Sequence, residues 1–341
     1  MARGTASPFP EPGPGAAPVS ATALALILAA AAAHATWNLF TKQASAAGGP
    51  SFVWLMSLTA TVLYAPVVVG SVLLSPPRLT ALAWLFMIGT GLLQVGYFLF
   101  LQAGYGRGDL SLVYPLGRGS GALLAALAGI TLLGERPGPA GITGIVLVVL
   151  GVLVLGAPGR AAGSAPVPGT APLLAPRPSP APGAPRAPRA PGAPRAPRAP
   201  RASRAIIFAL VTGTFIASYT LWDKYAVSTL RVPPLLQGYA SLPVMALVLA
   251  PFALRQRDRT TRVWHRYRRQ VTGAAVLSPL AYILVLIAMS FTAVSAVAPA
   301  REVSVLAGVI LGRRLLGEGS LARRLAAAGA IAAGIVCIAV G

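Results

Sequence analysis

Long apolar runs constrain this chain more than any other feature. Ten such runs, each of about 20 residues, follow one another along the 341 residues, and about 20 helical residues cross the core of a bilayer. Only 10% of the residues are charged, whereas a soluble domain has about 25%. A transmembrane barrel would show alternation with period two, and these runs are continuous. The sequence therefore predicts an all-α polytopic membrane protein with ten transmembrane helices. The expected spans are residues 22–42, 51–73, 80–103, 109–133, 139–157, 205–226, 233–254, 271–291, 294–316 and 321–340.

The spans divide into two groups of five. Residues 1–20, rich in Pro, Gly and Ala, predict a disordered tail before the first group, 21–157. Residues 158–204 repeat Ala-Pro-Arg and predict an extended linker, because proline opposes helix and favours polyproline II. The second group occupies residues 205–341.

The formal net charge of +21 is concentrated in two segments between apolar runs. Residues 158–204 hold eight arginines and no acid, and residues 255–269 hold seven arginines and one aspartate. Such segments predict membrane-flanking loops, which are commonly basic on the cytoplasmic side and can touch anionic lipid head groups. Nucleic acid is not an expected partner, since no basic motif with interleaved aromatics appears.

The two groups are related in sequence. HATWNLFTKQAS (His34 to Ser45) aligns without a gap with IASYTLWDKYAV (Ile216 to Val227). The alignment pairs Trp37 with Tyr219, and it pairs Lys42 with Lys224, the only lysines of the chain.

Further matches follow in the same order. YFLFLQA aligns with YILVLIA, which pairs Tyr97 with Tyr282, and Arg118 then matches Arg301. Each arginine is followed by the motif LLGE, whose glutamate stands seventeen residues after the arginine. Because five spans is an odd number, the second copy is expected to be inverted relative to the first. Inverted repeats are the architecture of many secondary transporters, whose substrate site lies near the midplane between the repeats.

These segments resemble the EamA repeats of the drug/metabolite transporter superfamily. The resemblance rests on HATWN with its following lysine, YPLGRGSG, APAREVS and the two LLGE endings, and it covers both groups of spans. It implies ten helices in two inverted five-helix repeats, and transport of small metabolites, amino acids or drugs across the bacterial inner membrane, often outward. The chain departs from the pattern in its long linker, and in GEG at Gly319 where the first copy has GER at Arg136.

Several side chains are candidates for substrate binding or gating. They are Trp37, Lys42, Tyr97, Arg118, Tyr219, Lys224, Tyr282, Arg301 and Glu302. Charged groups inside a membrane are costly and usually face the protein interior or a wet cavity. For the arginines, snorkelling to the interface remains an alternative. For the lysines, interfacial anchoring is the alternative to a gate. For the aromatics, an interfacial belt is the alternative to a substrate pocket.

Proton coupling requires a titratable group inside the membrane, for which His34, Asp223 and Glu302 are candidates. A facilitator or an exchanger without such a group remains an alternative. Glu135 and Glu318 are expected to stop one helix and cap the start of the next. GRGD, Gly106 to Asp109, contains the GxGD of intramembrane aspartyl proteases, but its place between two spans favours a plain turn.

The sequence thus predicts a secondary transporter, not an enzyme, that moves an amino-acid-like or drug-like metabolite by alternating access, with efflux as the expected direction. No cofactor or metal is expected, because the chain has no metal-ligand cluster or phosphate-binding glycine loop. The alternative function is a membrane scaffold or a lipid-carrier flippase subunit. The expected location is the bacterial cytoplasmic membrane. Charge bias predicts cytoplasmic loops after the odd-numbered spans and both termini outside, whereas the resemblance implies cytoplasmic termini.

Overall fold

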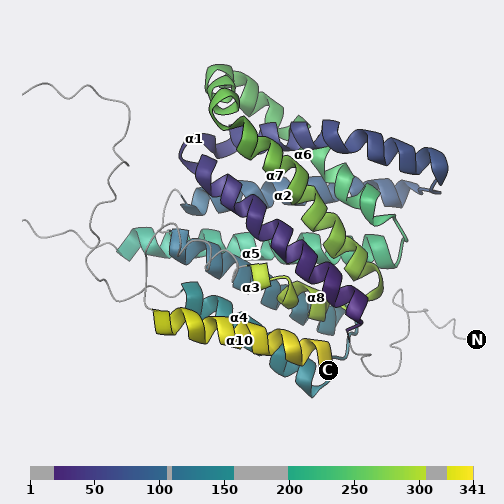
Figure 1. The fold of residues 1–341 in the computed structure, drawn as a ribbon, viewed down its shortest axis with the longest axis vertical. Coiled ribbons are helices and arrows are strands. Elements are labelled where there is room, and N and C mark those ends of the chain that lie inside the picture. The colour runs from purple at the N-terminus through teal and green to yellow at the C-terminus, as the bar shows by residue number, and fades with distance from the viewer. Residues whose placement is uncertain (1–18, 106–109, 157–198, 305–320, 341) are drawn as a thin grey trace, which may run out of the picture.

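The computed structural model describes residues 19–105, 110–156, 199–304 and 321–340, in which every regular element is a helix (Figure 1). The helices are α1 (Ala21–Leu74), α2 (Ala81–Tyr105), α3 (Leu110–Leu132), α4 (Pro139–Gly156), α5 (Ala199–Ser228), α6 (Pro234–Arg255), α7 (Arg257–Phe291), α8 (Val294–Ala300) and α10 (Leu321–Val340). An all-α fold is therefore confirmed for the described residues. The predicted N-terminal tail and most of the predicted linker lie outside them, although α5 begins five residues before the expected end of that linker.

Six helical segments are long and apolar enough to cross a membrane. They are Ala21–Asn38, Gly49–Leu74, Ala81–Leu101, Arg204–Ser228, Pro234–Arg255 and Arg257–Phe291. Shorter apolar helices lie at Leu116–Leu132, Pro139–Val154 and Gly329–Val340. Large apolar side chains such as Leu247, 72% exposed, cover the outside of the bundle, as a lipid-facing surface requires. The expected ninth span, 294–316, is described only as far as Ser304.

Helix α1 contains the first two expected spans, joined at a sharp kink. Gly49 adopts φ 42° and ψ −145° there, a left-handed region that glycine enters at little steric cost. Pro50 follows directly and lacks the amide that a continuous helix would use. At its start, the helix is capped by the Ser20 hydroxyl, which accepts a hydrogen bond from the amide of Ala23 at 3.2 Å.

The prediction of a loop at residues 255–269 is wrong, because this basic segment is helical. Helix α6 ends at Arg255. Helix α7 begins two residues later and continues through a kink at Tyr267 into the expected eighth span. Thr260 and Val263 are buried on one face, whereas all seven arginines are exposed. The Thr260 hydroxyl donates to the Ser51 hydroxyl at 3.0 Å. The segment is thus an amphipathic helix docked on the bundle, a pattern that its charge obscures.

The two halves of the chain interleave. The most extensive helix contacts join one half to the other: α1 with α7, α4 with α10, and α3 with α5. Figure 1 shows α4 and α10 side by side at one edge of the bundle. Contact between α3 and α5 depends on small residues, since a Cβ at Gly121 would lie 2.8 Å from the Cβ of Ile216. Gly121 therefore permits the close approach of α5 to α3.

Candidate functional site

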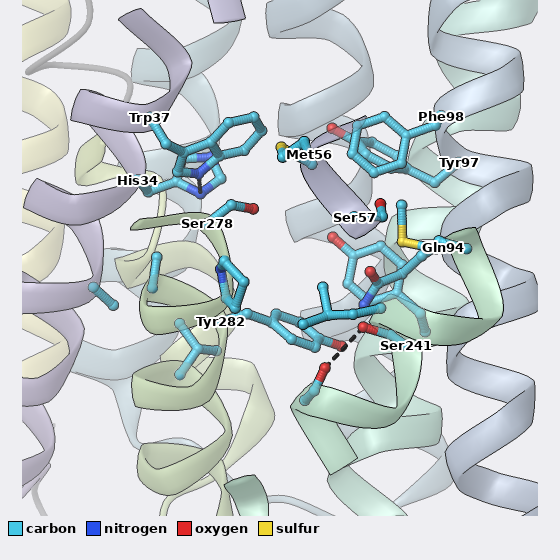
Figure 2. A pocket seen from close by; sticks show the side chains of 18 of the residues that line it. His34, Trp37, Met56, Ser57, Gln94, Tyr97, Phe98, Ser241, Ser278 and Tyr282 are labelled. Atoms are coloured by element: carbon cyan, nitrogen blue, oxygen red, sulfur yellow. Dashed lines mark hydrogen bonds between the residues drawn. The ribbon is translucent and has the colours of Figure 1, made fainter. Parts of the chain in front are cut away.

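A cavity of about 790 Å³, a volume that includes its open mouth, lies between the two halves. Its walls come from α1, α2, α3, α5, α6 and α7, together with Arg301 at the end of α8. In Figure 2, His34 and Trp37 lie on one side of the cavity, and Gln94, Tyr97 and Phe98 lie on the other.

Arg118 and Glu302 form a buried two-bond ion pair across the halves. The Arg118 Nε donates to Glu302 Oε2 at 3.0 Å, and its Nη2 donates to Oε1 at 2.8 Å. The two side chains are 4% and 1% exposed. Arg118 therefore stays in the interior instead of extending to an interface. This geometry is the strong, directional form of an arginine–carboxylate contact.

Arg301, the sequence equivalent of Arg118, lies in the same cavity but is less fully bonded. Its Nη2 donates to the Tyr219 hydroxyl at 3.5 Å, and its Nε lies 4.0 Å from Glu302 Oε1. That Nε is buried and has no hydrogen-bond partner among the described residues. Both oxygens of Glu302 accept from the distant Arg118, whereas the adjacent Arg301 only approaches one of them. The two arginines that align in the sequence repeat thus lie at one site, but they differ in how fully they are hydrogen-bonded.

Aromatic rings gather beside the arginines. The ring centroid of Tyr219 lies 6.1 Å from that of Tyr97 and 6.1 Å from that of Tyr282, both in edge-to-face geometry. All three rings line the cavity, as does Trp37, whose indole nitrogen donates to His34 Nδ1 at 3.1 Å (Figure 2). Edge-to-face pairs are favourable arrangements of aromatic rings. The structure therefore places these four aromatics around the cavity instead of at the two ends of the bundle.

Asp223 lies behind Tyr282 and is fully buried. Its carboxylate accepts hydrogen bonds from the hydroxyls of Tyr282 and Thr90, and from Gln237 Nε2 at 2.8 Å. Every one of these donors is neutral. Asp223 therefore differs from Glu302, whose carboxylate is bonded to a guanidinium. Within the described residues, no three His, Cys, Asp or Glu side chains gather in a way that could hold a metal ion.

Lys224 lies outside the cavity, at the corner between α7 and α8. Its ammonium donates to the carbonyls of Met289 and Thr292, each at 2.8 Å. The corner is held from the other side by Glu135, whose carboxylate accepts from the amides of Val294 and Ser295. Glu135 thus caps α8 of the opposite half, not the next helix as expected. The side chain of Lys42 and the whole of Glu318 lie outside the described residues.

Sequence reasoning missed several polar side chains that line the cavity, among them Ser57, Gln94 and Ser241. It also missed the Thr90 and Gln237 contacts to Asp223. The available signal was a polar residue in the middle of an apolar run, because such residues usually face the protein interior. Ser57 is such a residue, 0% exposed within the second expected span.

The model of the EamA-like transporter family matches residues 21–157 and 203–340, one match for each half of the chain. The chain belongs to the EamA-like transporter family. It is a multi-pass membrane protein, and its family is one of small-molecule transporters. No curated protein matches the chain. The chain is similar to a solved structure titled "Crystal structure of protein", with a TM-score of 0.64 and 16% sequence identity. The aligned region covers 93% of this chain and 96% of the chain in that structure. At that identity the likeness concerns the fold alone.

Proposed function

We propose that this EamA-family protein is a secondary transporter that moves a small metabolite through the cavity between its two halves. The observation that carries the proposal is the convergence of Arg118 and Arg301. These residues are equivalent in the sequence repeat, they lie in different halves, and they line one cavity. A buried cation from each half, at one shared pocket, suits a carrier whose halves exchange roles during transport.

The proposal includes ten membrane spans, with five in each half, and an inverted relation between the halves. Under alternating access, the helices around the cavity rock so that it opens first to one side of the membrane and then to the other. We place the protein in the bacterial cytoplasmic membrane and propose efflux as its direction. The interleaving of α1 with α7 and of α3 with α5 supports rocking of whole helices, since buried interfaces favour discrete arrangements over continuous deformation.

Asp223 is the proposed proton site of this carrier. It contacts the cavity through Tyr282, and the hydrogen bonds described for it all come from neutral groups. Glu302 is bonded to Arg118, and a proton on that carboxylate would break a buried ion pair. His34 Nδ1 accepts a hydrogen bond from Trp37, so a proton there would displace an existing contact. Intramembrane carboxylates commonly act as proton relays in transporters.

The test is transport by the purified full chain in proteoliposomes. A panel of radiolabelled amino acids, organic acids and amines should include compounds that show saturable uptake and counterflow, that is, exchange of external label for internal substrate. The Arg301→Gln variant, reconstituted at equal density, should lose this transport. If no compound moves faster than in protein-free vesicles, or if Arg301→Gln transports at the parental rate, the proposal is wrong.

A further inference from the structure

Among the described residues that line the cavity, two buried polar groups have no hydrogen-bond partner. The Ser57 hydroxyl, on α1, is fully buried and unpaired, and the Arg301 Nε, after α8, is buried and unpaired as well. Both residues line the cavity. A buried polar group without a hydrogen-bond partner destabilises the folded protein, so native proteins rarely contain one unless a ligand or water bonds it. Both of these groups can donate to an acceptor that enters the cavity.

The charge of the cavity wall is unbalanced. Two guanidinium groups, Arg118 and Arg301, belong to the lining, which contains no aspartate or glutamate among the described residues. Glu302 is bonded at both oxygens by Arg118. Asp223 lies behind Tyr282 and already accepts from three donors. Of the two arginines in the lining, Arg301 is therefore the one whose positive charge is less fully paired with a carboxylate.

The remaining walls are mostly apolar or aromatic, with Met56, Phe98, Leu242 and Val285 beside the tyrosine rings. Such walls favour an apolar or aromatic body on the ligand. They also raise the cost of bringing in an ammonium group, since a buried cation without a counter-charge is strongly disfavoured. The lining offers such a group no free carboxylate.

We propose that the cavity binds a small organic monocarboxylate with an apolar body, and that its carboxylate oxygens accept from Arg301 and Ser57. The identification of this ligand as a transported substrate rests on the proposed function. The site excludes amines and binds zwitterions weakly, because each adds an ammonium that the cavity cannot pair. The sequence predicted an amino-acid-like substrate. The proposed ligand has the carboxylate group of an amino acid but not its ammonium group.

The binding test uses the full chain purified in detergent and three matched probes: phenylacetate, phenylethylamine and phenylalanine. We expect phenylacetate to bind saturably in calorimetry and to raise the midpoint of thermal unfolding. Phenylethylamine should show no binding, and phenylalanine should bind at least tenfold more weakly. Equal affinity for the three probes would overturn the proposal. So would a lack of saturable binding by phenylacetate, benzoate and hexanoate together.

Ser57→Ala supplies a variant whose fold is not at risk. Its hydroxyl has no protein partner to lose, so the free energy of unfolding should stay the same or rise. Its affinity for phenylacetate should fall roughly tenfold, as loss of a hydrogen bond to a charged group implies. Ser71→Ala is the matched control. It lies on the same helix, outside the cavity lining, and its hydroxyl donates to the Val68 carbonyl at 2.9 Å. Unchanged affinity in Ser57→Ala would remove this serine from the site.

Arg301→Gln and Arg301→Lys test the cation. Gln at this position should abolish phenylacetate binding, and Lys should retain part of it, because Lys keeps the charge but not the planar fork. Full binding by Arg301→Gln would overturn the proposal. Transport separates this inference from the proposed function. If the protein transports amines but binds no carboxylate, the proposed ligand class is wrong and the transport function stands. If it binds a carboxylate but transports none of the compounds, the transport function is wrong and the ligand class stands.

Discussion

Glu135 accepts a hydrogen bond from the backbone amide of Val294 at 2.7 Å, across 159 residues of sequence. Its second carboxylate oxygen accepts from the next amide, that of Ser295, at 2.8 Å. The first amides of a helix have no partner within it and carry a partial positive charge. A residue of the first half thus completes a short helix of the second half, next to the segment that carries Arg301.

Replacing Glu135 should therefore destabilise the protein. Glu135→Ala removes both acceptors, and we expect a loss of about 1–2 kcal/mol in the free energy of unfolding, a usual cost of removing a helix cap. The measurement is thermal or denaturant unfolding of the purified variant in detergent. Arg136→Ala is the control, because Arg136 is adjacent and exposed. Equal stability of the two variants would show that the cap contributes nothing.

Replacing either of the two equivalent arginines should abolish transport, but the two replacements should differ in their effect on the free energy of unfolding. Arg118→Gln leaves the Glu302 carboxylate buried without its partner, which typically costs about 3–5 kcal/mol. Arg301→Gln should cost less, because the Arg301 Nε has no hydrogen bond to lose. Unfolding measurements on both variants, together with transport assays, check this difference. Adding Glu302→Gln to Arg118→Gln should restore much of the stability but none of the transport. If Arg301→Gln is the less stable single variant, this account of the pair is wrong.

Asp223 should couple transport to protons. Asp223→Asn keeps the size of the side chain and an acceptor oxygen but cannot carry an exchangeable carboxyl proton. We expect accumulation driven by a pH gradient to fall to the level of protein-free vesicles, whereas exchange of substrate for substrate continues. Both rates can be measured in the same proteoliposomes. If Asp223→Asn still accumulates substrate when driven by a pH gradient, the proton site is Glu302 or His34, the other two candidates, instead of Asp223.

The basic helix at residues 255–269 bears on membrane orientation. Its seven arginines are exposed and lie at the end of an apolar span, the position where basic residues act most strongly on topology. We expect this helix to be cytoplasmic and the C-terminus to be outside. A reporter that is active only in the cytoplasm should be silent when fused after Gly341 and active when inserted in the predicted linker, 158–204. The reverse pattern would restore the orientation that the family resemblance implies.

The sequence was most informative where the two halves could be compared. Aligning them singled out Arg118 with Arg301 and Tyr97 with Tyr282, and the structure places all four around one cavity. The partner of Arg118 was not predictable in this way, because Glu302 has no counterpart in the first half, where Gly119 follows the arginine. Ser57 gave no periodic signal, since one serine in a continuous apolar run leaves the hydropathy almost unchanged.

Charge misled the prediction at residues 255–269. Seven arginines suggested a loop, whereas Thr260, Val263 and Val271 are buried at helical spacing and hold the segment on the bundle. Glu135 was correctly expected to act as a cap, but local sequence could not identify the helix that it caps. Contacts between residues far apart in the chain depend on packing that a single sequence does not display.

The pairing of Arg118 with Glu302 also has a consequence for biosynthesis. The two residues are separated by 184 positions, and a ribosome adding about 5–20 residues per second needs roughly 10 to 40 seconds to cover them. Throughout that interval the first half carries a buried-site arginine whose counter-ion has not been synthesised. Its helices also lack the partners α5, α7 and α10 that cover them in the finished bundle. The nascent first half therefore waits in an incomplete state, and the last spans to leave the ribosome complete its folding as well as their own.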